Sequence, residues 1–585
     1  MEEAGKQSVK VRWAFYIGMI YIPLGLVALI NLILLWGWNS SDLRMDMQIW
    51  VTRILLGGFV VTEVARASLT WRRWSYLRAN WLELLLTLAA FFILVFEGFI
   101  SNEIQQVWHP HNMGTVPLVY MSLAMLVALA SFFLRSVLPQ LSVLSRKVSP
   151  ERLFIASFAM MILVGTLLLK LPRATPDGIS WLDALFTSTS SVCVTGLIVL
   201  DTATQFTHFG HCILLLLMQV GGLGIMTLTY VIAVMLSREI SMKEQIILSD
   251  YLNEDNYSRV HTLLKLIIRT VALFEFLGAI AIYFTLPSSL GTVSDRIFLS
   301  VFHSVSAFCN AGFSVFPNGL ATQSIAQNNG LQFSVIILIV FGGLGFFVLR
   351  EIGLHIRATV IRQYRVKRWS LHTKIVIWMS GILIFVGAFF IALSNCLNGQ
   401  PLDLMAALFQ SVSARTAGFN TVDMGLLSHG AVVTLVFLMF VGGSPGGTAG
   451  GIKTTVIGVA VINLWHYLRG RDQVQIFNRR ISPENSRRTF AILTLSMLIV
   501  FCVWLMLCMT HPQLNSLDLG FETVSAFSTV GLTRNLTPEL NTFGRLLIIL
   551  TMFIGRIGIL YFAVALFSGR ESHQILCPKE HILLG

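Results

Sequence analysis

Long apolar stretches recur from one end of the sequence to the other, and they restrict the fold more than any other feature. An α-helix needs about 20 apolar residues to cross the hydrocarbon core of a bilayer. Candidate spans lie at about 13–37, 47–65, 81–100, 116–139, 153–171, 209–236, 262–287, 331–349, 373–395, 429–465, 487–510 and 543–567. Only 12% of the 585 residues are charged and 55% are hydrophobic, whereas soluble domains have roughly 25% charged residues. The sequence therefore predicts an all-α polytopic membrane protein and excludes a secreted disulfide scaffold, a disordered chain and an ordinary cytosolic enzyme.

Basic residues cluster in the gaps that follow an even number of these spans. Because Lys and Arg are enriched in cytoplasmic loops, both ends of the chain are expected in the cytoplasm. The basic loops around 357–374 and 469–488 could dock a partner or could equally be topology signals that face acidic lipid. The first apolar run is too long for a signal peptide and is expected to be retained. The net charge of +12 lies in these loops, without the aromatic-lined basic stripe of a nucleic-acid surface, so no nucleic-acid partner is expected. Seven cysteines without a CxxC pair predict no disulfide and no structural metal site.

A short apolar-polar segment that ends in glycine occurs four times. The four copies are FTSTSSVCVTG (186–196), FHSVSAFCNAG (302–312), FQSVSARTAG (409–418) and FETVSAFSTVG (521–531). Their glycines are 116, 106 and 113 residues apart, which indicates an internal repeat of helix, short re-entrant helix with a loop, and helix. The expected organisation is an amino-terminal extension of about four transmembrane helices (1–150), repeats at 151–237, 262–352, 373–467 and 487–568, and a cytoplasmic tail at 569–585.

These segments are too short to cross a bilayer, and backbone without secondary structure is tolerated at membrane depth only inside protein or around a wet cavity. Four such loops around one axis could replace the water shell of an ion with backbone carbonyls, as selectivity filters do. Glycine would allow the sharp turn. No carboxylate lines the loops, which favours a monovalent cation over calcium. The residues expected to form the filter are Cys193, Val194, Thr195, Gly196, Cys309, Asn310, Ala311, Gly312, Arg415, Thr416, Ala417, Gly418, Ser528, Thr529, Val530 and Gly531.

A second set of glycines follows each loop glycine by 24 to 30 residues, at Gly221, Gly342, Gly442 and Gly555. It is expected inside the second helix of each repeat, where small residues permit close packing. The third copy differs, because residues 442–451 contain six glycines and Pro445. This composition predicts a break in that helix.

Three segments resemble the KtrB and TrkH branches of the Trk/Ktr/HKT superfamily of cation-uptake subunits. They are WLDALFTSTSSVCVTGL (181–197), SVSARTAGFNTVD (411–423) and GGSPGGTAGGIKTT (442–455), and the resemblance covers about residues 150–568. It implies four pore-loop repeats in a pseudo-fourfold arrangement around one pore, in each subunit of a homodimer in a bacterial inner membrane. In this superfamily a glycine in every filter loop accompanies potassium, and a serine in the first accompanies sodium. The extension 1–150 is longer than is typical of either branch.

The resemblance also implies roles for individual residues. Potassium is the implied transported ion, with sodium possible, no covalent cofactor, and ligands at Val194, Thr195, Asn310, Ala311, Thr416, Ala417, Thr529 and Val530. The implied intramembrane gate comprises Gly446, Gly447, Thr448, Ala449, Gly450, Gly451 and Lys453, with Arg556 below the filter. A cytoplasmic ring of nucleotide-binding subunits, like TrkA or KtrA, is the implied regulatory partner.

Some interpretations stay open at this point. Arg556 could repel a passing cation or belong to a structural ion pair, with Glu275 as a candidate partner. Arg415 is expected to anchor the loop from behind, and the hydroxyls of Thr195, Thr416 and Thr529 are expected to brace the loops while carbonyls bind the ion. A sodium-permeable or sodium-coupled carrier is the first alternative function. An intramembrane serine hydrolase at Ser444 would need a strand-turn-helix context that an apolar helix does not offer, and a sensor on a non-conducting pore is the third alternative.

Overall fold

The fold is known from a computed structural model that describes residues 21–37, 42–69, 81–95, 150–224, 257–361, 368–471 and 473–567. Within these ranges the chain is almost entirely helical, with one two-stranded hairpin. Four helices are long and apolar enough to cross a bilayer alone, at Met47–Ser68, Leu266–Thr285, Leu371–Leu397 and Pro483–Thr510. Their mean hydropathy supports a multi-pass membrane protein.

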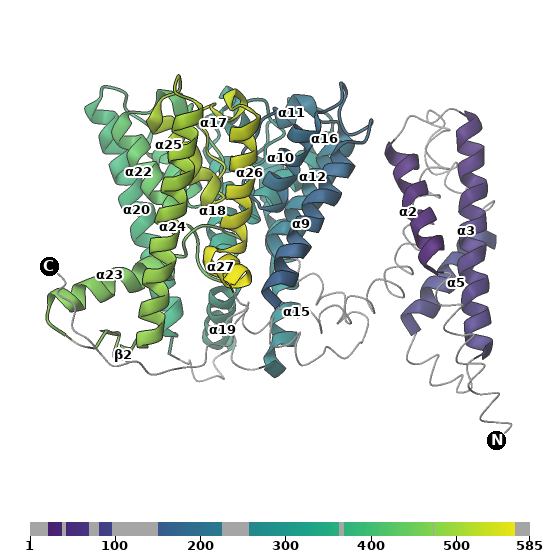
Figure 1. Cartoon of the computed structure of the whole chain (residues 1–585), viewed down its shortest axis with the longest axis horizontal. Coiled ribbons are helices and arrows are strands. Elements are labelled where there is room, and N and C mark those ends of the chain that lie inside the picture. The colour runs from purple at the N-terminus through teal and green to yellow at the C-terminus, as the bar shows by residue number, and fades with distance from the viewer. Residues whose placement is uncertain are drawn as a thin grey trace.

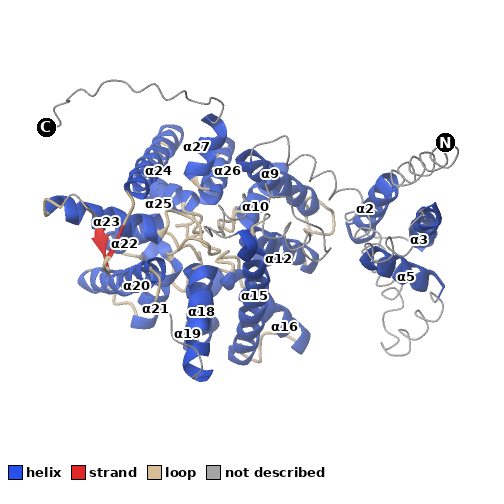
Figure 2. Cartoon of the chain, turned by 90° about the horizontal axis from the view of Figure 1, so that it is seen from below, coloured by secondary structure: helices blue, strands red, loops and turns tan. Residues whose placement is uncertain are grey.

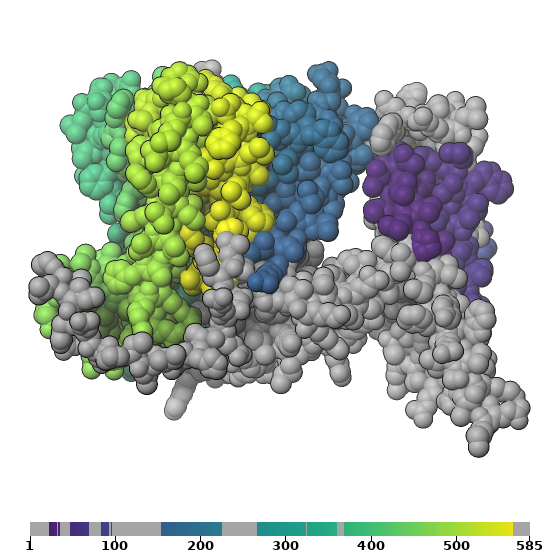
Figure 3. All heavy atoms as spheres, viewed as in Figure 1, coloured from purple at the N-terminus to yellow at the C-terminus, as the bar shows by residue number. Residues whose placement is uncertain are grey.

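Three helices near the amino terminus form a group of their own. α3 (Asp42–Leu69) packs on both α2 (Tyr21–Gly37) and α5 (Trp81–Val95), and the Asn31 amide donates to the Thr52 hydroxyl across α2 and α3 at 3.2 Å. Figures 1 and 3 show this group, in purple, beside the remaining helices. The predicted fourth helix of the extension, at 116–139, lies outside the described residues.

From residue 150 onward, one order of elements occurs four times: a long helix, a short helix, a loop and a second helix. The first group contains α9 (Pro150–Leu169), α10 (Trp181–Val192), α11 (Thr202–Gln205) and α12 (His208–Leu223). The second contains α15 (Tyr257–Thr285), α16 (Val293–Phe308), η2 (Gly319–Ala321), α17 (Gln323–Ala326), α18 (Asn329–Leu344) and α19 (Phe346–Ile361).

The third and fourth groups follow the same order. The third contains α20 (Leu371–Leu397), α21 (Leu404–Ser413), η3 (Met424–Leu426), α22 (His429–Phe440), α23 (Thr454–Leu468) and the hairpin β1 (Gln475–Ile476) and β2 (Arg479–Arg480). The fourth contains α24 (Pro483–Thr510), α25 (Ser516–Phe527), η4 (Thr537–Glu539), α26 (Thr542–Ile557) and α27 (Ile559–Phe567).

Each group packs on the next, and the last packs on the first. The second helix of one group contacts the short helix of the following group in the pairs α12 and α16, α18 and α21, α22 and α25, and α26 and α10. One buried cluster combines Leu214 and Val192 of the first group with Leu519 and Met552 of the fourth. Figure 2 shows the result: the loops gather in the middle and the helices surround them.

Three of the four short helices begin at side-chain caps, whereas Asp403 before α21 makes no side-chain cap hydrogen bond. Ser180, Thr292 and Asn515 cap α10, α16 and α25 by accepting hydrogen bonds from backbone N–H groups of the first turn. At α16 the cap is reciprocal, because the Asp295 side chain accepts from the Thr292 backbone. The Thr292 hydroxyl and N–H stabilise the charged form and lower the pKa of the exposed Asp295 carboxyl.

The prediction of continuous second helices was wrong. α12, α18 and α26 end at Gly224, Gly345 and Gly558, which have φ of 77°, 90° and 91°, and α18 and α19 are bent by 105° at their break. The predicted spans 331–349 and 543–567 are therefore each two helices. Gly221, Gly342 and Gly555 lie inside their helices, in the last turn, whereas Gly442 lies beyond the end of α22. The predicted break at 442–451 is confirmed, since α22 ends at Phe440 and α23 begins at Thr454.

The glycine sets permit close contact with the short helices. A Cβ built on Gly221, Gly342 or Gly555 would lie 2.1, 2.0 or 1.8 Å from the carbonyl oxygen of the last residue of the short helix of the same group, namely Val192, Phe308 or Phe527. A side chain at any of these positions would separate the second helix from the loop that follows the short helix.

Candidate functional site

The four loops after the short helices share one backbone conformation. Cys193, Cys309 and Ser528 cap the carboxyl ends of α10, α16 and α25 with right-handed dihedrals, and Ala414 does so for α21. In three loops the first predicted member is therefore the cap of the short helix, whereas in the third loop the cap precedes the first predicted member, Arg415. Val194, Asn310, Thr416 and Thr529 then have φ of 57°, 58°, 75° and 50°, and the loop glycines Gly196, Gly312, Gly418 and Gly531 have φ of 85°, 69°, 79° and 93°.

Left-handed dihedrals at residues other than glycine are strained, and such strain persists where the surroundings enforce it, which is frequent at functional sites. Here the enforcing contact is a backbone hydrogen bond. The residue before each loop glycine donates its N–H to a serine carbonyl: Thr195 to Ser190 at 2.8 Å, Ala311 to Ser306 at 2.7 Å, Ala417 to Ser413 at 2.9 Å, and Val530 to Ser525 at 2.9 Å.

The same four serines hold the far side of each loop, a role that the sequence interpretation missed. The hydroxyls of Ser190, Ser306 and Ser413 donate to the carbonyls of Leu197, Phe313 and Phe419, each directly after the loop glycine. In the fourth loop the Ser525 hydroxyl accepts from the Gly531 N–H at 3.1 Å. The signal was present in the sequence as a serine five or six residues before every loop glycine.

The loops contact one another in a closed ring. A Cβ built on Gly196 would lie 2.4 Å from the Ala311 carbonyl oxygen, and one on Gly312 would lie 2.7 Å from that of Ala417. One on Gly418 would lie 2.2 Å from that of Val530, and one on Gly531 would lie 2.0 Å from that of Thr195. Each loop glycine thus faces the carbonyl that precedes the glycine of the next loop, and the fourth returns to the first.

Buried polar side-chain atoms without a hydrogen-bond partner gather at this ring. They include the hydroxyls of Thr195, Thr416, Ser528 and Thr529 and the amide of Asn310. Buried polar atoms are usually paired, so a group of unpaired ones indicates a place where a ligand or water supplies the partner. The expectation that the threonine hydroxyls brace the loops was wrong, because the serines do so.

The loop glycines also line a cavity. All four border one cavity of about 520 Å³, together with residues of the following connections that include Asp201, Asn318 and Asp423. Among the described residues, no lysine or arginine lines this cavity. Its acidic groups favour the approach of a cation.

Arg415 lies behind the ring. Its guanidinium donates to the hydroxyl of Ser380 on α20 at 3.1 Å and to the Ser380 carbonyl at 3.4 Å. This placement agrees with the expected anchoring role, and the Arg415 side chain does not line the cavity beside the ring.

The second loop has a polar support that the other described loops do not share. Gln219 of α12 donates to the carboxylate of Glu275 on α15 at 3.1 Å, and the Cys309 thiol approaches Gln219 Oε1 and Glu275 Oε1 at 3.7 and 3.9 Å. The backbone carbonyl of Glu275 accepts from Ser304 of α16 at 2.7 Å, a bond whose equivalents Ser188 and Ser411 make in the first and third groups. Glu275 therefore supports the second loop and does not pair with Arg556.

The 441–453 loop is held against the second group by backbone hydrogen bonds. Val441 and Ile452 form a parallel bridge across its base. The Ser444 and Thr448 N–H groups donate to the carbonyls of Gly343 and Gly342 at 3.0 and 3.2 Å, and Phe346 donates to the Gly446 carbonyl at 2.9 Å. The loop therefore rests on the break between α18 and α19.

Thr448 is the most connected residue of this loop. Its hydroxyl lies 3.1 Å from both the Phe308 and the Gly342 carbonyl oxygens, and its own carbonyl accepts from Arg556 at 2.5 Å. Gly450 lies under the fourth filter-like loop, since a Cβ there would be 1.9 Å from the Thr529 hydroxyl oxygen. The 441–453 loop is thus directly against the ring.

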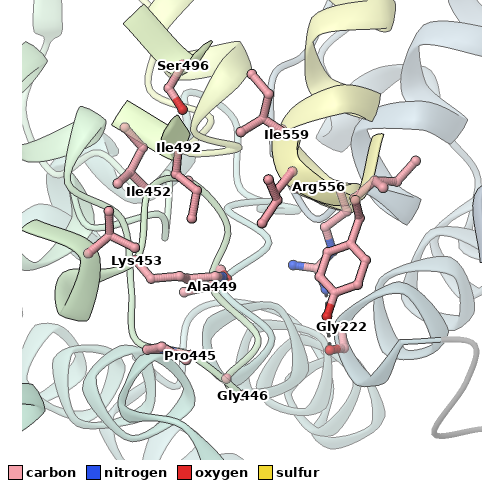
Figure 4. Close-up of a pocket in the computed structure, with 18 of the residues that line it drawn as sticks. Gly222, Pro445, Gly446, Ala449, Ile452, Lys453, Ile492, Ser496, Arg556 and Ile559 are labelled. Atoms are coloured by element: carbon pink, nitrogen blue, oxygen red, sulfur yellow. Dashed lines mark hydrogen bonds between the residues drawn. The ribbon is translucent and has the colours of Figure 1, made fainter. Parts of the chain in front are cut away.

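Arg556 connects the loop to the first group. Besides Thr448 it donates to the carbonyls of Gly221 and Gly222 at 2.5 and 3.4 Å. Lys453 donates to the Ala449 carbonyl at 2.7 Å. Figure 4 shows Arg556, Gly222, Ala449 and Lys453 around a cavity of about 480 Å³. The partners of this half-buried arginine are backbone carbonyls, not a carboxylate.

Ser444 has no hydrolytic partner among the described residues. Its hydroxyl lies 3.1 Å from that of Thr454, and it forms no hydrogen bond to a histidine or carboxylate in the described ranges. The described residues also contain no group of three or more His, Cys, Asp or Glu side chains that could hold a metal ion.

Comparison with known proteins identifies the family to which this chain belongs. Residues 154–575 match the TrkH family, described as cation transport proteins. The chain is 37% identical over 444 residues to the Ktr system potassium uptake protein B of Bacillus subtilis, covering 75% of this chain and 97% of that protein. It is 35% identical to the potassium/sodium uptake protein NtpJ of Enterococcus hirae, covering 75% and 98%.

A solved structure agrees at the level of the fold. The crystal structure of the potassium transporter TrkH from Vibrio parahaemolyticus matches with a TM-score of 0.58 and 16% identity, covering 83% of this chain and 97% of that one. The family match begins at residue 154, after the group of α2, α3 and α5, and includes all four loops and the 441–453 loop. The chain therefore belongs to the TrkH family of cation transport proteins.

Proposed function

We propose that this chain is the ion-translocating subunit of a Trk/Ktr-type system and takes up potassium through a gated pore. The observation that carries the proposal is the closed ring of four strained loops with unpaired buried polar atoms. The printed functions of the relatives, potassium uptake and potassium/sodium uptake, support a monovalent cation as the substrate.

The ring is the proposed selectivity filter, and the four groups are proposed to surround one pore with pseudo-fourfold symmetry. Backbone carbonyls can replace the hydration shell of a weakly hydrated cation without a fixed negative charge. The proposed ligands are the carbonyls of the two residues before each loop glycine: Val194, Thr195, Asn310, Ala311, Thr416, Ala417, Thr529 and Val530. The unpaired hydroxyls beside them can bind water or the ion during passage.

The 441–453 loop is the proposed gate. It lies against the fourth filter loop, and its glycines give it conformations that a helix does not have. Arg556 places a positive charge below the ring, which opposes a cation on the axis while the loop is in place. Because Arg556 bonds to Thr448, displacement of the loop would also release the arginine.

The membrane potential can drive uptake. It contributes about 2.3 kcal/mol per unit charge per 100 mV, which corresponds to roughly 50-fold accumulation of a monovalent cation. A selective pore that opens therefore suffices, and no ATP hydrolysis by this chain is required.

Assembly and location are further parts of the proposal. The homodimer, the nucleotide-binding regulatory ring and the bacterial inner membrane follow the superfamily resemblance. Cytoplasmic ends follow from the distribution of basic residues. The division into an extension and four repeats follows the order of elements in the four groups.

A potassium flux assay on purified protein tests the proposal. Liposomes containing the protein and an imposed inside-negative potential should accumulate potassium, and sodium should compete weakly. Equal uptake of both ions would favour the sodium-permeable alternative, for which the potassium/sodium relative is the supporting observation. Absence of flux for either ion would contradict the pore. Ser444→Ala should leave the flux intact, because that hydroxyl contacts Thr454 and not the ring.

A further inference from the structure

The helix after the 441–453 loop presents an apolar face to its surroundings. Figure 1 shows α23 running crosswise at the end of the molecule that also carries α19 and the hairpin. Val461, Leu464, Trp465 and Leu468 are all exposed, and their spacing of three, four and seven residues places them on one side of the helix. Asn463 and His466 are buried on the opposite side. A helix in a water-facing position would have the reverse pattern.

A groove runs between this face and the hairpin. Its volume is about 360 Å³, and its lining includes Val461, Leu464, Trp465, Leu468 and Ile476. This size lies within the roughly 300–1,000 Å³ of pockets that hold small organic molecules. The lining is almost wholly apolar, so the groove suits a hydrocarbon chain.

The hairpin that forms the other wall is fixed in place. Its turn residues Phe477 and Asn478 have φ of 49° and 61°, as two-residue hairpin turns require. The Gln475 N–H donates to His466 of α23 at 3.4 Å, and Lys374 of α20 lies over the Phe477 ring at 5.1 Å. The groove is thus part of the fold.

Arginines border the groove. Arg479 and Arg480 lie directly opposite Ile476 and Gln475 in the hairpin, and the Arg469 guanidinium lies 4.5 Å over the Trp465 ring. Arg471 is exposed beside them. Among the residues that the structure describes, no carboxylate forms an ion pair with any of these four arginines.

We propose that the groove between α23 and the hairpin binds an anionic phospholipid, with an acyl chain along Val461, Leu464 and Leu468 and the phosphate at Arg479 and Arg480. Guanidinium groups bind phosphate through paired hydrogen bonds, and the cytoplasmic leaflet supplies anionic lipid. Tryptophan and tyrosine are enriched at the depth where headgroups meet acyl chains, and α23 carries Trp465 and Tyr467, both exposed. A water-soluble phosphate ligand would leave the apolar wall unused.

Occupancy of this site would act on the 441–453 loop, a consequence that rests on the proposed gate. α23 begins where the loop ends: the Thr454 N–H donates to the Gly443 carbonyl at 3.0 Å, and the Thr454 and Ser444 hydroxyls are 3.1 Å apart. A lipid that holds α23 in the headgroup region therefore restrains one end of the loop.

Native mass spectrometry of the purified full-length protein, titrated with phosphatidylglycerol or phosphatidylcholine, tests the binding. We expect selective retention of phosphatidylglycerol and roughly 10- to 30-fold weaker retention by R479Q/R480Q, at about 1 kcal/mol per basic side chain. The variant R487Q/R488Q removes the same charge on α24, away from the groove, and should retain the lipid. Equal losses in the two variants, or no loss in either, would overturn the site.

A second pair of variants tests the apolar wall. Val461→Trp fills the groove and should lower phosphatidylglycerol retention, whereas Leu498→Trp on the exposed face of α24 should not. Light scattering on the same samples reports the mass of the assembly. If Val461→Trp or R479Q/R480Q changes the oligomeric state, the groove is an interface between copies of the chain and the lipid proposal is wrong.

Flux separates the regulatory consequence from the binding. Wild-type protein in vesicles with and without phosphatidylglycerol should differ in potassium flux, and R479Q/R480Q should remove the difference. If the protein retains the lipid but its potassium flux does not depend on lipid composition, the coupling to the gate is wrong and the binding site is still supported.

Discussion

At each loop glycine two separate requirements exclude a side chain. The left-handed φ disfavours any other residue, and the next loop's carbonyl oxygen occupies the space of a Cβ. Gly178 has the same φ as Gly418 to within a degree, 80° against 79°, but a Cβ at Gly178 would meet nothing within 4 Å. Substitutions at these two positions therefore distinguish the effect of backbone strain from the effect of contact with the neighbouring loop.

We predict that Gly418→Ala lowers the selectivity for potassium over sodium by about tenfold or more. The added Cβ would clash with the Val530 carbonyl oxygen and must displace it. A tenfold change in selectivity corresponds to about 1.4 kcal/mol. Gly178→Ala should cost only the roughly 1–2 kcal/mol of a left-handed residue in stability and leave selectivity unchanged. Competition of sodium with potassium uptake measures both. Equal selectivity in the two variants would contradict the filter assignment.

The serine that supports each loop gives a second test. Ser306→Ala removes the donor to the buried Phe313 carbonyl, at a cost of about 1–3 kcal/mol, and should lower both selectivity and thermal stability. Ser300→Ala in the same helix removes a bond to the Arg296 carbonyl within the helix and serves as the control. Unchanged ion competition in Ser306→Ala would show that the loop holds its shape without the hydroxyl.

The loop glycines could be predicted because their spacing recurs four times in the sequence. The support of the loops was harder to predict, since threonines and serines alternate in these segments and both can brace a backbone. The decisive fact is geometric: a residue in the last turn of the short helix can reach past the glycine, whereas Thr195, Thr416 and Thr529 lie within the ring itself. The partners of Arg556 could not be predicted, because backbone carbonyls carry no signature in the sequence.

At the scale of elements, the broken second helices are the main difference from expectation. Apolar residues continue on both sides of Gly345 and Gly558, so the hydropathy pattern predicts one continuous span. The bend depends on one left-handed glycine and on a hydrogen bond from Phe346 to a loop about 100 residues later in the chain. The break at 441–453 was predictable because it contains proline and six glycines in ten residues.

Few side chains hold the 441–453 loop in place, and a substitution of Thr448 tests their role most directly. Thr448→Val keeps the shape and removes the hydroxyl's contacts with Phe308 and Gly342, so we expect a higher potassium flux at the same driving force, by roughly fivefold or more for a net loss of about 1 kcal/mol. Thr434→Val on α22 removes a bond within the helix and should leave flux unchanged.

Deletion within 445–451 is expected to raise the flux further, because the shortened loop cannot reach both Gly342 and Arg556. If flux in the deletion and in Thr448→Val equals that of the wild type, the loop does not gate the pore. Flux measured in liposomes at a fixed imposed potential distinguishes these outcomes.

At the scale of the whole molecule, the ring closes through contacts between the first and last groups. Asp183 of α10 pairs with Arg545 of α26 at 2.7 Å, and both side chains are mostly buried. We expect Asp183→Asn to lower the thermal unfolding midpoint, because it leaves a partly buried guanidinium without its charged partner. Glu484→Gln breaks the exposed pair with Arg488 and should change the midpoint little. Equal midpoints would show that this closure does not depend on the pair.

A single chain that closes on itself can place different residues at equivalent positions. Arg556 stands where the first and second groups have Gly222 and Gly343, and only the third group, among the described residues, has the long interruption at 441–453. A channel of four identical polypeptides would have to carry four such arginines around its axis or none, and four moving segments or none. Fusing the four groups into one polypeptide allows a single arginine at this position and a single interrupted segment to face each other, so each can be changed by mutation without a fourfold effect.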